Sequence, residues 1–324
     1  MSGPPIRPVV GRLAPSPTGA QHVGNARTYL IAWLSARSRG GRVVLRIEDI
    51  DSPRVKPGAG EQACQDLIWL GLDWDDGPVV QSERISLYRS ALKRLQEQEL
   101  IYPCTCTRSD VERAGSAPHP EHEGPVYPGT CAGRSVRDAD SLGDRPWCWR
   151  FRVPVISPSF VDGFRGPTAI DLRVLGGDFV IWKAPRAGQA ESTPAYQLAV
   201  VVDDAAQGVT EVVRGDDLIP STPRQLLLYQ ALGLTPPSFV HVPLVVGPDG
   251  RRLAKRHGDT RLSTLREAGV RPELLLGLLA WSCGWIESIK PTTARELLPR
   301  FRLESVPPKP WILTPELLHR IGDE

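Results

Sequence analysis

Residues 12–26 contain the chemically most suggestive stretch of the chain. The stretch reads RLAPSPTGAQHVGNA and leads into a helical pattern over residues 27–39. A helix that begins here would present free backbone N–H groups and the positive end of its dipole to an anion. Gly24 has no Cβ to keep a ligand from the backbone, and His22 can donate a hydrogen bond to a phosphate oxygen. From these residues alone, a nucleotide site and an ordinary loop in which His22 caps the helix are equally well supported.

Acidic residues follow a predicted strand. Residues 43–47 form an apolar run that is typical of a buried parallel strand, and Glu48 and Asp49 come directly after it. Because α/β sheets bind ligands at the carboxyl ends of their strands, both carboxylates are candidates for a binding site. A helix cap or a surface turn is the alternative for this pair.

Arg214 ends a second apolar run, residues 209–213, which predicts another strand. A guanidinium at that place can hold a carboxylate through two hydrogen bonds, which suits an acidic ligand. A salt bridge to Asp216 or Asp217 is the alternative. A helix is expected to follow, capped by Ser221 or by the threonine after it, with a proline in its first turn.

Three cysteines in a loop-rich stretch, residues 102–134, supply soft metal ligands. Cys104 and Cys106 form a C-x-C pair, and Cys131 follows. Because this stretch has little apolar content, a tetrahedral zinc ion is the natural means of holding it together. Spacing alone suggests His119 or His122 as the fourth ligand, and three unligated cysteines are the alternative. The other cysteines show no partner pattern and are expected to be packing residues: Cys64, Cys148 and Cys283.

The order of the elements predicts an α/β fold. Helices are expected at residues 27–39, 60–72 and 83–100, in alternation with strands, which is typical of a doubly wound parallel sheet. Residues 147–183 have three β-rich runs, at 148–155, 167–174 and 178–183, and the αβ order resumes after them. We therefore expect a Rossmann-like sheet whose two halves are split by a zinc-bearing insert, followed by a helical cap with a helix starting at Pro315. The expected boundaries are 1–101 for the first half, 102–190 for the insert, 191–245 for the second half and 246–324 for the cap.

The composition excludes several classes of protein. With 324 residues, 41% hydrophobic and 23% charged, the chain has the make-up of a globular protein of about two domains. No apolar run approaches the roughly 20 residues of a membrane span, and the N-terminus lacks the apolar core of a signal peptide. We therefore expect a cytoplasmic protein without membrane contact. A net charge of +2 neither requires nor excludes a nucleic-acid partner.

Several of these stretches resemble motifs of the class I aminoacyl-tRNA synthetases, the glutamyl kind in particular. Residues 12–24 match R-x-A-P-S-P-T-G-x-x-H-x-G at every fixed position, and Asn25 stands where the generic signature has a second histidine. Residues 46–51 match R-I-E-D-x-D, and residues 214–217 read RGDD. RLAKR, at residues 252–256, is similar to the KMSKS signature, with Ala254 and a final arginine in place of its serines.

The resemblance implies roles for individual residues. Glutamate would be bound by Arg12, Ala14, Ser16, Glu48, Tyr196 and Arg214. ATP would be bound, together with Mg²⁺, by His22, Gly24, Asn25 and Lys255, of which His22 and Lys255 would be catalytic. The C-x-C pair followed by Y-x-x-x-C is similar to the zinc site of the glutamyl-Q tRNA(Asp) synthetases, whose ligands here would be Cys104, Cys106, Tyr127 and Cys131.

The same family implies a reaction. Its members activate glutamate with ATP without needing tRNA, and then transfer the glutamate to queuosine in the anticodon loop of tRNA(Asp). The chain also ends where a glutamyl-tRNA synthetase would continue into an anticodon-binding region, and a monomer is expected. Three alternatives stay open. They are a truncated synthetase that charges the 3′ end of tRNA(Glu), a non-catalytic paralogue that binds tRNA or zinc, and a ligase for another acidic molecule.

Overall fold

A parallel sheet forms the centre of the molecule. A computed structural model describes residues 8–50, 55–114, 126–185, 192–251, 253 and 260–322. Its first three strands run parallel in the order β1-β2-β3: Val10–Leu13, Arg42–Ile47 and Asp76–Val80. Strands β10 (Glu211–Gly215) and β11 (Ser238–Val242) are also parallel, and Thr210 N donates to Val10 O to place β10 beside β1. Two groups of parallel strands, one from each half of the chain, therefore lie side by side, and the predicted α/β fold is confirmed.

Helices connect and cover these strands. Their bounds are α1 Val23–Arg37, α2 Ala59–Trp69, α3 Ile85–Glu97, α5 Tyr196–Ala206 and α6 Ser221–Ala231. Helix α1 packs against β1 and β10 and is buried along most of its length, including Leu30, Ile31 and Leu34. It begins four residues before the predicted start because His22 caps it. The expected cap of α6 is wrong, since Ser221 is the first helical residue and its hydroxyl accepts from Gln197 instead.

An antiparallel sheet lies between the two halves of the parallel sheet in the chain. Its order is β4-β5-β8-β9: Ile101–Cys104, Cys148–Phe151, Phe179–Lys183 and Thr193–Pro194. The helix α4 (Arg108–Ala114) and the hairpin β6 (Phe160–Asp162) and β7 (Gly166–Thr168) complete this insert. Two predicted β runs are too long. The first ends at Phe151, because the N–H of Val153 donates to the Asp178 side chain instead of to a neighbouring strand. The second gives way to turns after Thr168.

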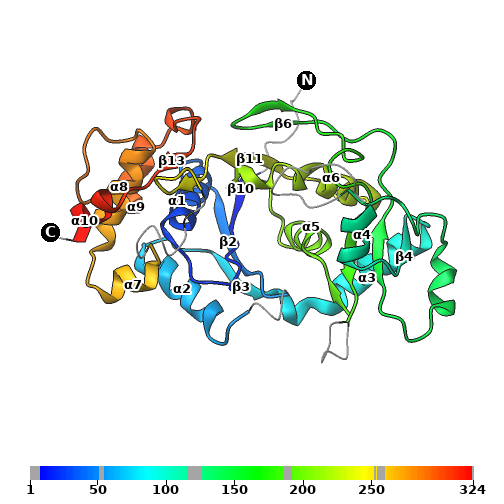
Figure 1. Ribbon diagram of the computed structural model, residues 1–324. Coiled ribbons are helices and arrows are strands. Elements are labelled where there is room, and N and C mark those ends of the chain that lie inside the picture. The colour runs from blue at the N-terminus through cyan, green and yellow to red at the C-terminus, as the bar shows by residue number, and fades with distance from the viewer. Residues whose placement is uncertain are drawn as a thin grey trace, which may run out of the picture.

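The C-terminal part is mostly helical, as expected. Its elements are β12 Val245–Val246, α7 Leu262–Glu267, α8 Pro272–Ser282, α9 Ala294–Leu297, β13 Trp311–Ile312 and α10 Pro315–Gly322. Short 3₁₀ turns occur at Gln81–Arg84, Val136–Ser141, Asp216–Leu218, Leu298–Arg300 and Leu303–Ser305. Arg27 fastens α8 to α1, because its guanidinium donates to Ser282 Oγ. Figure 1 shows the parallel strands in the middle, with α7, α8 and α10 at one end and α3, α4 and β4 at the other. Within the described residues, no helix combines the length and the apolar character that a membrane span needs.

Candidate active site and metal centre

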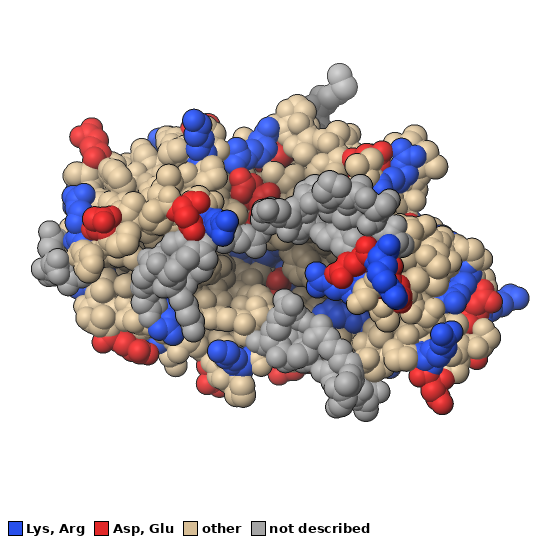
Figure 2. Space-filling model, in the orientation of Figure 1, with Lys and Arg blue, Asp and Glu red and all other residues tan. Residues whose placement is uncertain are grey.

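A cavity of about 640 Å³ opens where the carboxyl ends of β1, β2 and β10 meet. Figure 2 shows the surface hollowed near the centre of the molecule, with basic and acidic groups inside the hollow. The lining includes every residue predicted to contact glutamate or ATP that the structure describes: Arg12, Ala14, Ser16, His22, Gly24, Asn25, Glu48, Tyr196 and Arg214. Lys255 falls outside the described residues, so its place in the site stays a prediction.

His22 caps helix α1 with its ring. Its Nδ1 accepts from the backbone N–H groups of Gly24 and Asn25, at 3.1 and 3.3 Å. An imidazole nitrogen that accepts carries no proton, so the ring proton of neutral His22 resides on Nε2. Burial lowers the pKa of His22, which favours this neutral form. The two interpretations of His22 are therefore compatible, because the ring caps the helix through one nitrogen and retains a donor on the other.

The helix N-terminus does not present free backbone N–H groups, which corrects an expectation. Besides the amides of Gly24 and Asn25, that of Val23 donates to Thr260 O at 2.9 Å and that of Ala26 donates to His22 O at 3.0 Å. Glycine suits position 24 for the cap as well, because a Cβ there would lie 3.0 Å from the His22 ring, a tight contact. Asn25 Oδ1 accepts from His22 N, which completes a capping box. A phosphate would therefore interact with the helix dipole and with His22 Nε2 more than with these amides.

The segment after the RLAKR motif lies against the turn that holds His22. Leu262 N donates to Gln21 O, and Val23 N donates to Thr260 O, each at 2.9 Å. Leu253, inside the motif, lines the same cavity. The fold therefore brings the described flanks of the two predicted signature motifs together, although they are more than 200 residues apart in the sequence.

Arg214 is buried in the wall of the cavity with neutral partners. Its guanidinium donates from Nε to His241 Nε2, from Nη1 to Gln225 Oε1 and from Nη2 to Thr222 Oγ1, at distances of 2.8 to 2.9 Å. A longer bond of 3.4 Å reaches Leu218 O. The alternative salt bridge to Asp216 is wrong, because that carboxylate pairs with Arg165. No carboxylate within the described ranges forms an ion pair with Arg214.

Burial lowers the pKa of Arg214, but a guanidinium still remains charged. The charge is held in a low-dielectric setting, at only 4% exposure, beside the Tyr196 side chain. Leaving a buried charge without a counter-ion is costly. The arrangement therefore favours a ligand that brings a carboxylate.

Two other charged residues of the cavity are held by a buried ionic network. Arg12 Nε lies 3.2 Å from Asp204 Oδ1, and the same oxygen is 2.8 Å from Arg46 Nη1. Arg46 Nη2 in turn donates to Glu48 Oε1 at 3.0 Å. The guanidinium of Arg12 and the carboxylate of Glu48 are thus fixed from the interior, and both residues line the cavity. Opposite charges at the two places suit a carboxylate and an ammonium group.

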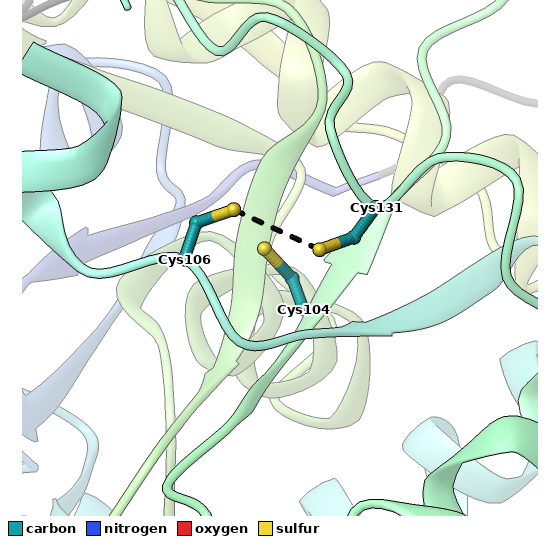
Figure 3. Close-up of side chains that lie close together, drawn as sticks. All are labelled: Cys104, Cys106 and Cys131. Atoms are coloured by element: carbon teal, nitrogen blue, oxygen red, sulfur yellow. Dashed lines mark hydrogen bonds between the residues drawn. The ribbon is translucent and has the colours of Figure 1, made fainter. Parts of the chain in front are cut away.

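The sulfur atoms of Cys104, Cys106 and Cys131 point toward one another, as Figure 3 shows. The Cys106 and Cys131 sulfurs are 3.7 Å apart. A tetrahedral zinc ion with bonds of about 2.3 Å places two sulfur ligands about 3.8 Å apart. The Cys106–Cys131 distance therefore suits a zinc ion, and all three sulfurs lie within 4.8 Å of one another.

The Tyr127 hydroxyl, the predicted fourth ligand, lies beside two of these sulfurs. Its oxygen lies 3.4 Å from the sulfur of Cys104 and 4.0 Å from that of Cys106. Burial raises the pKa of Tyr127, but a backbone N–H of Cys131 donates to the oxygen at 2.8 Å and supports a phenolate. His119 and His122, the alternatives from spacing, lie outside the described residues.

Basic residues of the insert stabilise this cluster. Arg150 donates to the Cys104 sulfur at 3.3 Å and covers the Tyr127 ring at 3.9 Å from its centroid. Cys148 packs against the cluster, as expected of a packing residue. It lies opposite Cys104 in the sheet, and a hydrogen bond from its thiol lowers the pKa of Cys104 to about 4. The lowered pKa favours the thiolate form of Cys104.

Sequence reasoning missed several residues that hold the cavity in place. Asp203 and Asp204 end the apolar helix α5, and His241 stands alone among apolar residues of β11. Asp162 contacts His241 from the insert. Charged groups inside an apolar run were the available signal, because such groups are buried only when they are paired.

The lowered pKa of His22 predicts a dependence of stability on pH. The unfolded chain binds a proton to this histidine near pH 6.5, whereas the folded chain binds it only at lower pH. The unfolded state therefore holds more protons below pH 6.5, and the free energy of unfolding should fall as the pH falls through this range. Urea titrations at pH 7.5 and 5.5 would show it. The difference between the two should shrink in His22→Asn, and an unchanged difference would contradict the assignment to His22.

Comparison with known proteins agrees with this geometry. A family model for the catalytic domain of class I tRNA synthetases (E and Q) matches residues 8–316. A glutamyl-Q tRNA(Asp) synthetase of Rhodopirellula baltica is 57% identical over 282 residues, which cover 85% of each chain. One of Symbiobacterium thermophilum is 50% identical over 314 residues, covering 93% of this chain and 94% of the relative.

A solved structure also matches over nearly the whole chain. The glutamate-tRNA synthetase of Elizabethkingia anophelis aligns with a TM-score of 0.80 and 27% identity, covering 97% of this chain and 70% of that one. Sequence, fold and cavity therefore agree with the resemblance seen in the motifs. The chain belongs to the class I tRNA synthetases of the glutamyl and glutaminyl branch, and it is a ligase of the glutamyl-tRNA synthetase type.

Proposed function

We propose that this enzyme activates glutamate with ATP, without needing tRNA, and transfers it to queuosine in the anticodon loop of tRNA(Asp). The observation that carries the first step is the buried guanidinium of Arg214, which lines the cavity and whose partners among the described residues are neutral. The second step is supported by relatives that are named glutamyl-Q tRNA(Asp) synthetases and match the chain at 50 and 57% identity.

In the first step, the α-carboxylate of glutamate attacks the α-phosphate of ATP and pyrophosphate leaves. No side-chain nucleophile is required, because the substrate carboxylate is one. His22 Nε2–H lies on the cavity wall, where it can donate to a phosphate oxygen as negative charge develops. Lys255, in the RLAKR motif, would stabilise the same negative charge on the phosphates. Mg²⁺ that arrives with ATP would supply further positive charge to the phosphates.

Glutamate would be selected by charge. Arg12, Tyr196 and Arg214 offer donors to its carboxylates, and Glu48 offers an acceptor to its ammonium group. Glutamine carries a neutral amide in place of the side-chain carboxylate, so it would leave a buried cation without a counter-ion. Sites of this kind discriminate strongly against the analogue that lacks the required group.

The decisive experiment maps the product. Labelled glutamate, ATP and the enzyme are incubated with tRNA from cells that make queuosine and from cells that do not. Label in the anticodon loop of tRNA(Asp), only when queuosine is present, is the expected result. Label on the terminal adenosine of tRNA(Glu) would make the protein a 3′-charging synthetase. Absence of both label and glutamate-dependent ATP–pyrophosphate exchange would contradict catalysis altogether.

A structural zinc ion is part of the proposal. Cys104, Cys106, Tyr127 and Cys131 would hold it and thereby stabilise the loops that leave β4, without taking part in the reaction. Elemental analysis of purified protein should give one zinc per chain. Tyr127→Phe should weaken zinc binding by more than the roughly 10–100-fold caused by loss of an outer-shell partner.

Matched variants identify the fourth ligand. His119→Ala and His122→Ala should retain zinc when a competing chelator strips it from Tyr127→Phe. If a histidine variant lost zinc to the chelator while Tyr127→Phe retained it, that histidine would be the fourth ligand.

A further inference from the structure

The guanidinium of Arg214 is held from behind by two fully buried groups. Its Nε donates to His241 Nε2 over 2.9 Å, and His241 Nδ1 lies 2.6 Å from Asp162 Oδ2. Arg214 and His241 face each other in the register of β10 and β11, whereas Asp162 comes from the β6–β7 hairpin of the insert. Asp162 and His241 do not line the cavity, so neither would touch a substrate in it.

The chain of bonds fixes the tautomer of His241. An arginine N–H can only donate, so His241 Nε2 must accept and the ring proton must lie on Nδ1. That proton points at Asp162 Oδ2. The other carboxylate oxygen of Asp162 accepts the backbone N–H groups of Phe164, Arg165 and His241, at 2.8 to 3.2 Å. The carboxylate is therefore fixed in orientation as well as in place.

The charge states agree with these bonds. Burial alone would raise the pKa of Asp162, but the bonds from His241 and the backbone amides lower it, so the group stays ionised. Burial lowers the pKa of His241, so the ring stays neutral and keeps an acceptor for Arg214.

We propose that Asp162 and His241 are positioning residues that set the orientation of Arg214 toward the substrate carboxylate. This inference rests on the proposed function of the cavity. Asp162 dictates which nitrogen of His241 accepts, and His241 then holds the Nε edge of the guanidinium. The charge of Arg214 is thereby directed at the cavity without being neutralised. Asp162, which belongs to the insert, thus influences which amino acid substrate binds in the cavity beside the parallel strands.

The variant Asp162→Asn tests the proposal, because the shape is kept and only the acceptor changes. The amide can donate to His241 Nδ1, which moves the ring proton to Nε2, where it opposes the N–H of Arg214. The KM for glutamate should rise roughly ten- to hundredfold, since a buried donor loses its partner. The KM for ATP should change less than twofold, and the preference for glutamate over glutamine should fall. Asp171→Asn, an exposed carboxylate of the same insert, is the control and should behave as the wild type.

Two results would overturn the inference. One is an unchanged KM for glutamate in folded Asp162→Asn protein. The other is an equal rise in the KM for ATP together with a lower melting temperature. That result would show that Asp162 stabilises the fold in general and does not orient Arg214 in particular.

The tautomer of His241 can be measured without an activity assay, so it tests this inference independently of the proposed function. ¹⁵N shifts of His241 should show the proton on Nδ1 in the wild type and on Nε2 in Asp162→Asn. If the wild type lacks glutamate-dependent exchange, the proposed function fails, and the ¹⁵N shifts still decide whether Asp162 sets the tautomer. An Nε2-protonated wild-type ring would overturn the inference by itself.

Discussion

Replacing Arg214 with glutamine should lower glutamate-dependent ATP–pyrophosphate exchange by roughly 10²–10³-fold, the usual effect of removing one partner of a buried charged pair. The KM for glutamate should account for most of the loss, because the interaction is made on binding. Glutamine should become a better substrate relative to glutamate, since the unpaired cation that rejects it is gone. Steady-state exchange with both amino acids measures all three effects.

A matched variant separates this effect from damage to the strand. Arg39→Gln removes a guanidinium that pairs with Glu211, at the opposite end of the same strand β10 and outside the cavity. Its exchange rate should stay within twofold of the wild type. A similar loss of activity in both variants would assign the effect of Arg214 to the stability of β10, and not to recognition of glutamate.

The second large effect is expected at His22, whose two ring nitrogens have different tasks. In His22→Asn, the amide oxygen can still cap helix α1, because asparagine is among the best N-cap residues. It cannot replace the Nε2–H donor, so kcat should fall by roughly 10²–10³-fold. The melting temperature should stay close to that of the wild type. Single-turnover formation of the adenylate measures the chemical step directly.

His22→Ala completes the comparison, because it removes the cap as well as the donor. It should lose the same activity as His22→Asn and also about 0.5–2 kcal/mol of stability. If His22→Asn were fully active, the ring would serve only as a cap. The helix dipole and the signature loop would then have to stabilise the phosphates without it.

The patterns predicted the framework of the fold well. The apolar run at residues 43–47 lies in the parallel strand β2, and the run at 209–213 overlaps β10, which begins two residues later and extends to Gly215. Helix α3 lies within its predicted range, and α2 begins one residue before its own. The limits of the insert strands could not be read from hydrophobicity, because turns and a side-chain acceptor there end the ladders early. The cap of α6 was missed for a similar reason, since the Ser221 hydroxyl found a long-range partner in Gln197.

For the candidate site, the family motifs named residues that do line one cavity, but they did not show what holds them. The ion pair of Arg12 with Asp204 joins residues that are far apart in the sequence, and so does the bond of Arg214 to His241. The spacing of residues within a motif cannot predict contacts between distant segments of the chain. The motif allowed His22 either to cap helix α1 or to donate a hydrogen bond to a phosphate. The structure shows that Nδ1 forms the cap, which leaves Nε2 as the donor.

The buried network under the cavity has a consequence for its total charge. The guanidinium groups of Arg12 and Arg46 match the carboxylates of Asp204 and Glu48 in number, so these four sum to zero. Arg214 and Asp217, the other two charged residues of the described lining, also cancel, so the empty site carries no net charge there when His22 is neutral. Total charge therefore cannot select the ligand, and selection would depend on where each charge lies. The side-chain carboxylate of glutamate could pair with Arg214, whose hydrogen-bond partners among the described residues are all neutral, whereas the amide of glutamine could not. The position of one buried charge, and not shape, would thus distinguish two nearly isosteric amino acids.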